Sequence, residues 1–594
     1  MATLRSAHRM MLFAASTQTI DSPRVSRRGW LIGGAARSDW RELLRPRAVP
    51  GFGKLESLSL LVYTLLLAWC IPHHEGWFDE AQAWLIARDS SLVDMVVHRL
   101  HYEGSPALWH LLLWTEVRLG VSFLGMHLIA GALAAVGVYV WLRYCPLPRV
   151  VTLFAPFTFY LIYQYAVVAR SYVLAPLFVY GLLALYANRR SSPMVFALVA
   201  GLFANCSLHM AAMAAGLAVL YAMDRLWGEG AKESKWRLLA PAALLTALFV
   251  VSAATAMPTA DGSSTTANPL VEGIRNKVSH SVEKVVEVQT GPHELTNEGM
   301  LTEPPVQGPL ATKVWLAINR KPELGHRSLL DGRVLKHLLV LMTAVTAPIS
   351  TSNLLAAVFL LLLCVNLMRA RLWLALLPYA LVQVCNVLVS GEAHHIGLVW
   401  IAMMGAIWLL ALRPPRAGWD VGLRGTLYGC LLVVMLLQIG WSAHALAGDL
   451  RLPYSSSKAT AIFLATVPKE NRIAAFDDDS VTVNAYLPSR PYFNQQVDYW
   501  PFSRTKDPSL LIEQTMAQRP EMVLLKMAKP VSPVMDQWVK LVPAGSVFVD
   551  QKTLNMLESQ GYRETHRFCG DRFYRNTAES MDCRLVFERE TPLR

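Results

Sequence analysis

Residues 58–84, LSLLVYTLLLAWCIPHHEGWFDEAQAW, hold the signal from which the architecture follows. The apolar run 58–71, with its flanking residues, is about long enough to cross a ~30 Å hydrocarbon core as a helix. Polar residues follow it, and then an acidic pair, Asp79 and Glu80, at the start of a predicted short amphipathic helix on the membrane surface. This order predicts a membrane protein that carries ionisable groups at one face of the bilayer.

The composition of the whole chain agrees with this reading. Of the 594 residues, 54% are hydrophobic and 16% charged, and the mean hydropathy is +0.33; soluble chains average about 25% charged residues. Apolar runs recur along the first 450 positions, and we predict an all-α polytopic bundle of about eleven transmembrane helices. The predicted spans are 58–71, 126–142, 150–168, 173–187, 196–208, 211–223, 238–256, 354–368, 372–389, 399–412 and 427–445.

The basic residues predict the orientation of the bundle. The net charge of +12 comes from short clusters between apolar runs, which is typical of membrane topology and not of a nucleic-acid site. We therefore expect a basic cytoplasmic leader, 1–54, a transmembrane domain, 55–450, and an extracytoplasmic domain, 451–594. Two stretches, 73–120 and 258–336, are expected to be external loops. The second is longer than a simple connection in a compact fold, so we expect it to have a function.

The composition after residue 450 turns soluble, and alternating helix and strand candidates predict a small α/β domain. Cys569 and Cys583 are the two cysteines in polar sequence, and a disulfide between them is possible if this domain lies outside the cytosol. No cysteine spacing predicts a zinc site. The candidate helices are 458–465, 509–517 and 554–560, and the candidate strands are 473–476, 522–525 and 583–587.

Several polar groups are expected on the same face as the acidic pair. Their convergence suggests a shared aqueous cavity, because ionisable groups at span ends are costly; interfacial anchors are the alternative. Asp79 and Glu80 point about 100° apart on a helix, so we expect one to be a general base and the other structural. The candidate binding residues at this face are His101, Arg170, Tyr172, Glu392, His394 and His395.

Three motifs carry a resemblance: WFDEAQAW at 77–84, YEGSPALW at 102–109 and ARSY at 169–172. Over roughly residues 55–450 the chain resembles membrane glycosyltransferases of the GT-C fold, such as protein O-mannosyltransferases and lipid A aminoarabinose transferases, and most closely a bacterial branch of them. The resemblance implies that Asp79 is the catalytic base. Many relatives carry a basic residue where this chain has Ser105, so Arg170, His101, His394 and His395 become candidates for the phosphate contact.

The resemblance implies an integral protein of the bacterial inner membrane that transfers a sugar from a polyprenyl-phosphate donor to an extracytoplasmic acceptor, with inversion. The expected partners are the polyprenyl-phosphate sugar donor, an unidentified acceptor and membrane lipid, and we expect no nucleic acid. We expect no cofactor; a metal held by Asp79, His394 and His395 is the alternative. The rival functions are a multi-pass transporter or lipid flippase, and a non-catalytic membrane partner in envelope assembly.

Overall fold

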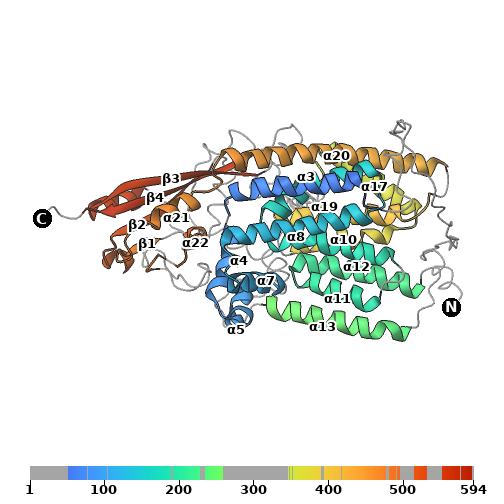
Figure 1. Ribbon diagram of the computed structural model, residues 1–594, viewed down its shortest axis with the longest axis horizontal. Helices are drawn as coiled ribbons and strands as arrows, with labels where there is room; N and C mark the ends of the chain where they lie inside the picture. Colours follow the sequence, from blue (N-terminus) through green and yellow to red (C-terminus); the bar gives the residue numbers. More distant parts are fainter. Residues whose placement is uncertain are drawn as a thin grey trace, which may run out of the picture.

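The computed structural model is mostly helical, with one small sheet at one end of a long helical bundle (Figure 1). The structure describes residues 51–76, 78–103, 105–188, 192–227, 235–257, 346, 348–350, 352–388, 393–415, 418–475, 480–489, 491–494, 514–530, 551–574 and 577–590. The predicted external loop 258–336 and the leader up to residue 50 lie outside this described part.

Among the described residues, six helical segments are long and apolar enough to cross a membrane, and each predicted apolar run falls mainly on helical segments. The number of runs that do cross stays a prediction. The six are Lys54–His73 (α3, Lys54–Cys70, and a 3-10 turn), α8 (Phe123–Tyr144), Arg149–Val167, Trp236–Ala256 (containing α13, Leu239–Ala256), His394–Ala411 in α19 (Ala393–Ala411), and α20 (Gly418–Arg451). The other five runs form α10 (Leu174–Ala187), α11 (Pro193–Ala204), α12 (Leu208–Trp227), α17 (Asn353–Arg369) and α18 (Leu377–Leu388).

Large aromatic side chains and a small residue fix the centre of the bundle. The ring of Trp141 on α8 lies 4.7 Å from that of Tyr180 and 5.6 Å from that of Trp408, so α8, α10 and α19 pack together. A Cβ on Gly137 would lie 2.9 Å from the backbone nitrogen of Leu177. The glycine therefore allows α8 and α10 the close approach typical of membrane helices.

The third apolar run is a broken helix. It consists of α9 (Arg149–Phe154), a 3-10 turn (Ala155–Phe157) and a π-helical segment, η4 (Tyr160–Val167), in which Tyr165 leaves helical geometry. All eight residues of η4 are buried. Such π segments frequently occur at functional sites, and this one ends three residues before Arg170.

The first loop folds into short helices that gather at the end of the bundle facing the sheet (Figure 1). Its first helix is predicted to lie on the membrane surface, and the structure shows that other parts of the protein cover most of its length. In α4, the eight residues from Glu80 to Ala87 are buried, because α7 and α22 pack against this helix. The loop helices are α4 (Phe78–Asp89), α5 (Leu92–Asp94), η2 (Met95–Arg99), α6 (Leu100–Glu103) and α7 (Leu108–Arg118).

The C-terminal domain contains a four-stranded sheet in the order β1-β2-β4-β3. β1 pairs with β2 in parallel and the other pairs are antiparallel. The three predicted strands fall on β1, β2 and β4, whereas β3 was not predicted. The elements are α21 (Ser457–Leu464), β1 (Ile473–Ala475), α22 (Ser480–Ala485), β2 (Met522–Pro530), α25 (Gln551–Ser559), β3 (Tyr562–Tyr574) and β4 (Thr577–Arg589).

Polar contacts fasten this domain to the first loop. Arg88 Nη1 on α4 donates to the carbonyl oxygens of Asn484, at 2.9 Å, and Leu487, at 2.6 Å. The backbone N–H of Gly76 donates to the hydroxyl of Tyr486, whose ring packs edge-on against Phe123 at 5.1 Å. Tyr486 belongs to an aromatic segment of the sequence, and its contacts are those of a docking residue.

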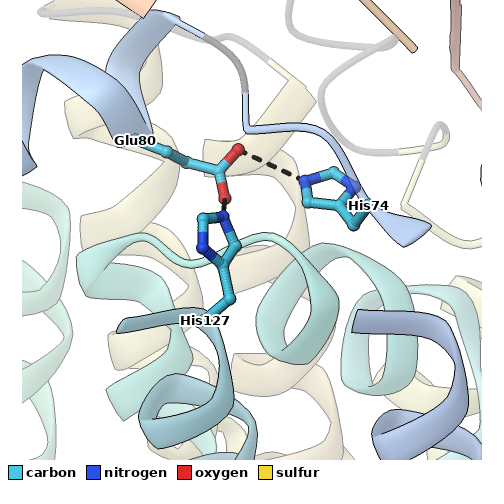
Figure 2. A group of neighbouring side chains, drawn as sticks. All are labelled: His74, Glu80 and His127. Atoms are coloured by element: carbon cyan, nitrogen blue, oxygen red, sulfur yellow. Dashed lines mark hydrogen bonds and ion pairs between the residues drawn. The ribbon is translucent and has the colours of Figure 1, made fainter. Parts of the chain in front are cut away.

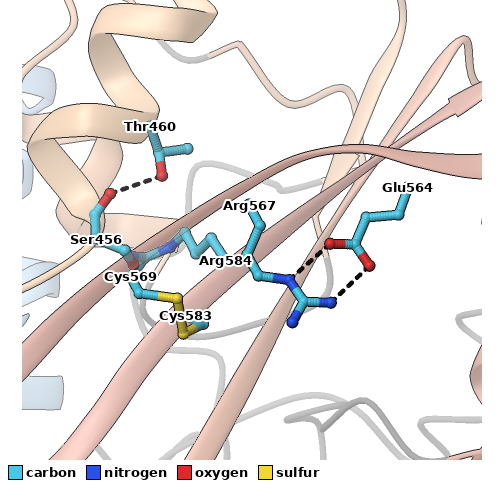
Figure 3. Close-up of a disulfide and its surroundings, with 7 residues drawn as sticks. All are labelled: Ser456, Thr460, Glu564, Arg567, Cys569, Cys583 and Arg584. Carbon is cyan, nitrogen blue, oxygen red and sulfur yellow. Dashed lines mark hydrogen bonds and ion pairs between the residues drawn. A yellow bond between two sulfur atoms is a disulfide. The ribbon is translucent and has the colours of Figure 1, made fainter.

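A disulfide joins β3 to β4 through Cys569 and Cys583, close to the buried Arg584 that reaches the Ser456 hydroxyl (Figure 3). We expect Cys569→Ser/Cys583→Ser to destabilise the domain by about 3 kcal/mol, because the bond closes a short loop in the unfolded chain. Thermal unfolding of the full-length protein should then begin several degrees lower. The control is Cys364→Ser, which removes a half-buried free thiol. Equal midpoints for native protein and double variant would contradict the expectation.

Candidate functional site

The two acidic residues at the start of α4 have different surroundings, in accord with the angle between neighbours on a helix. Asp79 Oδ2 lies 2.9 Å from Arg170 Nη1, and the Asp79 side chain is 38% exposed. Glu80 is fully buried and faces the interior of the protein. Of the pair, Asp79 is therefore the carboxylate that solvent can reach.

Arg170 is held between this carboxylate and an aromatic ring. It follows the broken helix, and its guanidinium carbon lies 5.3 Å from the centre of the Tyr172 ring. The Tyr172 ring in turn lies 5.2 Å from that of His394 and 5.6 Å from that of His395. These five residues, Asp79, Arg170, Tyr172, His394 and His395, form the Arg170 cluster, and they come from three separate segments of the chain.

The histidines of this cluster are more buried than the sequence suggested. We expected His394 and His395 in an external loop, but α19 begins at Ala393 and places them in its first turn, 3% and 7% exposed. His209 of α12, which we did not predict, stacks on His395 with ring centres 3.9 Å apart. The three imidazole rings therefore pack together, and those of His394 and His395 also contact the Tyr172 ring.

Two predicted site residues are not placed in the cluster. His101 has a different neighbour, because its Nδ1 contacts the carbonyl oxygen of Met257, where α13 ends. Glu392 lies outside the residues that the structure describes.

A second group of polar side chains lies below α4 and surrounds Glu80 (Figure 2). His127 Nε2 on α8 lies 3.0 Å from Glu80 Oε1, and His74 Nε2 lies 3.3 Å from Glu80 Oε2. On its other side, His74 Nδ1 lies 2.9 Å from Asp449 Oδ2, and Tyr163 donates its hydroxyl to Asp449 Oδ1 at 3.2 Å. These five residues, His74, Glu80, His127, Tyr163 and Asp449, form the Glu80 cluster.

Opposite charges compensate one another inside the Glu80 cluster. Burial lowers the pKa of His74, but the carboxylates of Asp449 and Glu80 outweigh burial and raise that pKa to about 10. Burial raises the pKa of Glu80, but His74 and His127 outweigh it and lower that pKa far below its usual range. The carboxylate therefore stays ionised although solvent does not reach it.

One backbone contact joins the two clusters. The N–H of Ala169 donates to Glu80 Oε1 at 2.6 Å. Ala169 directly precedes Arg170, and Glu80 directly follows Asp79, so the buried carboxylate fixes both halves of the Asp79–Arg170 ion pair.

Sequence reasoning missed His74, His127, Asp449 and His209. A signal existed for His127, which is an ionisable residue inside an apolar run and thus a functional candidate by default. Asp449 gave no such signal, since it is 375 positions from His74 in sequence and follows the last predicted span. Asp449 meets its partner His74 only because α20 packs beside the end of α3 in the fold.

Within the described part of the chain, the side chains close enough to share a metal ion are His74, Glu80 and His127, not the Asp79, His394 and His395 of the sequence alternative. No protein-family model matches this chain, and no curated protein matches it either.

Proposed function

We propose that this protein is a membrane glycosyltransferase that moves a sugar from a polyprenyl-phosphate donor to an extracytoplasmic acceptor. The observation that carries the proposal is the Asp79–Arg170 pair, in which a half-exposed carboxylate meets a guanidinium at 2.9 Å. A carboxylate suits removal of a proton from an acceptor hydroxyl. A guanidinium suits a phosphate, because its fork of N–H groups can donate two parallel hydrogen bonds.

The proposed reaction is a single displacement. The acceptor oxygen bonds to the anomeric carbon as the bond from that carbon to the phosphate oxygen breaks, and the electron pair leaves with the lipid phosphate. Asp79 accepts the acceptor proton, and Arg170 stabilises the charge that develops on the leaving phosphate. No covalent intermediate with the enzyme is required, so the product has the inverted anomeric configuration.

The surroundings of the pair assign roles to the other residues. Tyr172, with His394 and His395 behind it, supports the guanidinium of Arg170 from the buried side. Glu80 is a positioning residue in this scheme, since its carboxylate is buried and holds the backbone ahead of Arg170. His101 has no part in it.

The proposal includes an orientation in the bacterial inner membrane. The basic leader lies in the cytoplasm, and the first loop and the C-terminal domain lie outside, where the acceptor is. The Cys569–Cys583 disulfide supports this placement, because disulfides persist in oxidising compartments. The docking of the C-terminal domain on the first loop supports a common side for both.

The test is sugar transfer by the full-length protein, purified in detergent, from a panel of polyprenyl-phosphate sugars to cell-envelope glycans, lipids and proteins. We expect one donor to yield a glycosylated product of inverted configuration and free polyprenyl phosphate. A protein that transfers from no donor, yet moves the lipid-linked sugar across vesicle membranes, would replace the proposal with a flippase.

A further inference from the structure

The Glu80 cluster contains three side chains arranged as metal ligands. The two imidazole Nε2 atoms and a Glu80 oxygen all lie within 4.8 Å of one another, and the imidazole-to-carboxylate distances are 3.0 and 3.3 Å. Two ligands of a tetrahedral zinc ion, each about 2.1 Å from the metal, stand about 3.4 Å apart. Small rotations of the two rings would therefore bring all three groups to one ion.

The opposite side of each imidazole is already fixed in the way metal ligands require. His74 Nδ1 faces the carboxylate of Asp449, and His127 Nδ1 faces the carbonyl oxygen of Phe123, both at 2.9 Å. Metal-binding histidines nearly always donate their second ring N–H to such an acceptor, which leaves the other nitrogen's lone pair for the metal. Both rings thus turn Nε2 toward Glu80, as Figure 2 shows.

Charge also favours a divalent ion. Glu80 and Asp449 bring two negative charges into a site where the His74, Glu80 and His127 side chains are 2%, 0% and 4% exposed. One divalent cation with two neutral imidazoles balances them.

We propose that His74, Glu80 and His127 bind one zinc ion, with Asp449 and the Phe123 carbonyl orienting the two imidazoles. Two imidazoles and one carboxylate form a donor set that zinc takes in proteins, whereas magnesium and calcium prefer oxygen ligands. The site joins the end of α3, the first turn of α4 and the outer end of α8, and Asp449 adds α20. The ion is a positioning element that fixes α4, and hence Asp79, on the bundle.

Metal binding tests this inference without sugar transfer, so either proposal can fail alone. The full-length protein, purified without chelator, is analysed for metals by mass spectrometry, and we expect about one zinc per chain. After chelator treatment it should take up one equivalent of zinc, and cobalt should give a visible spectrum with nitrogen ligands. We expect Asp449→Asn to weaken zinc affinity by about 10- to 100-fold, the usual effect of losing such an orienting partner.

His127→Gln removes a ligand, and the matched control is His73→Gln, which alters an exposed neighbour whose Nδ1 contacts the Trp69 carbonyl oxygen. We expect the control to keep one zinc and His127→Gln to lose it. If His127→Gln does not fold, the titration of chelator-treated native protein decides. Failure of that protein to bind zinc, binding of manganese or magnesium in preference to zinc, or equal loss in both variants would overturn the proposal.

Discussion

Replacing Asp79 with Asn should reduce sugar transfer by about 100- to 10,000-fold, the range expected for loss of a general base. The amide keeps the shape of the side chain but cannot accept the acceptor proton, and it no longer neutralises Arg170. The side chain is 38% exposed, so the protein should stay folded. Initial rates of transfer and thermal midpoints of both proteins, measured in one detergent, test this expectation.

The matched control is Asp94→Asn, in the same loop. Its carboxylate is 34% exposed and pairs with Arg99 at 3.0 Å, so exposure and ion pairing resemble those of Asp79. We expect the control to transfer sugar at the native rate. Transfer by Asp79→Asn within a few-fold of native would leave the class of enzyme standing and remove Asp79 as its base.

Glu80→Ala should be the most destabilising single substitution in this region, by about 3–5 kcal/mol. The buried carboxylate lies 3.0 Å from the His127 imidazole and 3.3 Å from that of His74. Its removal leaves His127 without its carboxylate partner and His74 with Asp449 alone, and it frees the N–H of Ala169 from its acceptor. Thermal unfolding of the purified protein should shift downward by many degrees.

Asp89→Ala provides the comparison at the other end of α4. Its carboxylate pairs with the neighbouring Arg88 at a partly exposed position, where an ion pair contributes about 1 kcal/mol or less. A midpoint for Glu80→Ala equal to that of Asp89→Ala would mean that the Glu80 cluster contributes little to stability.

Hydropathy alone located the helices of the bundle, because long apolar runs have few alternatives to helix in a membrane. It located loop residues less well. His394 and His395 follow a polar Gly-Glu pair and looked like loop residues, yet they begin α19 and pack against His209 and Tyr172. The environment of these two histidines depends on side-chain packing between segments that are distant in sequence, which the local sequence pattern does not predict.

The sheet shows the same limit. β3 (Tyr562–Tyr574) was missed because its residues are largely polar, and residues 563–567 are exposed. Its strand conformation comes from pairing with β4, which is a contact between segments and not a property of either. Likewise, the sequence places Asp79 and Arg170 on one face, but only the fold brings them within 2.9 Å.

The helix α20 is longer than a membrane span requires. At 1.5 Å per residue its 34 residues span about 51 Å, whereas a hydrocarbon core measures about 30 Å, so the helix exceeds such a core by about four turns, divided between its two ends. Asp449 lies near the C-terminal end of α20, and α21 and then the sheet follow it in the chain. α20 therefore links the helical bundle to the sheet, and a slide of α20 along its axis relative to α3 would move Asp449 away from His74 by about the same distance.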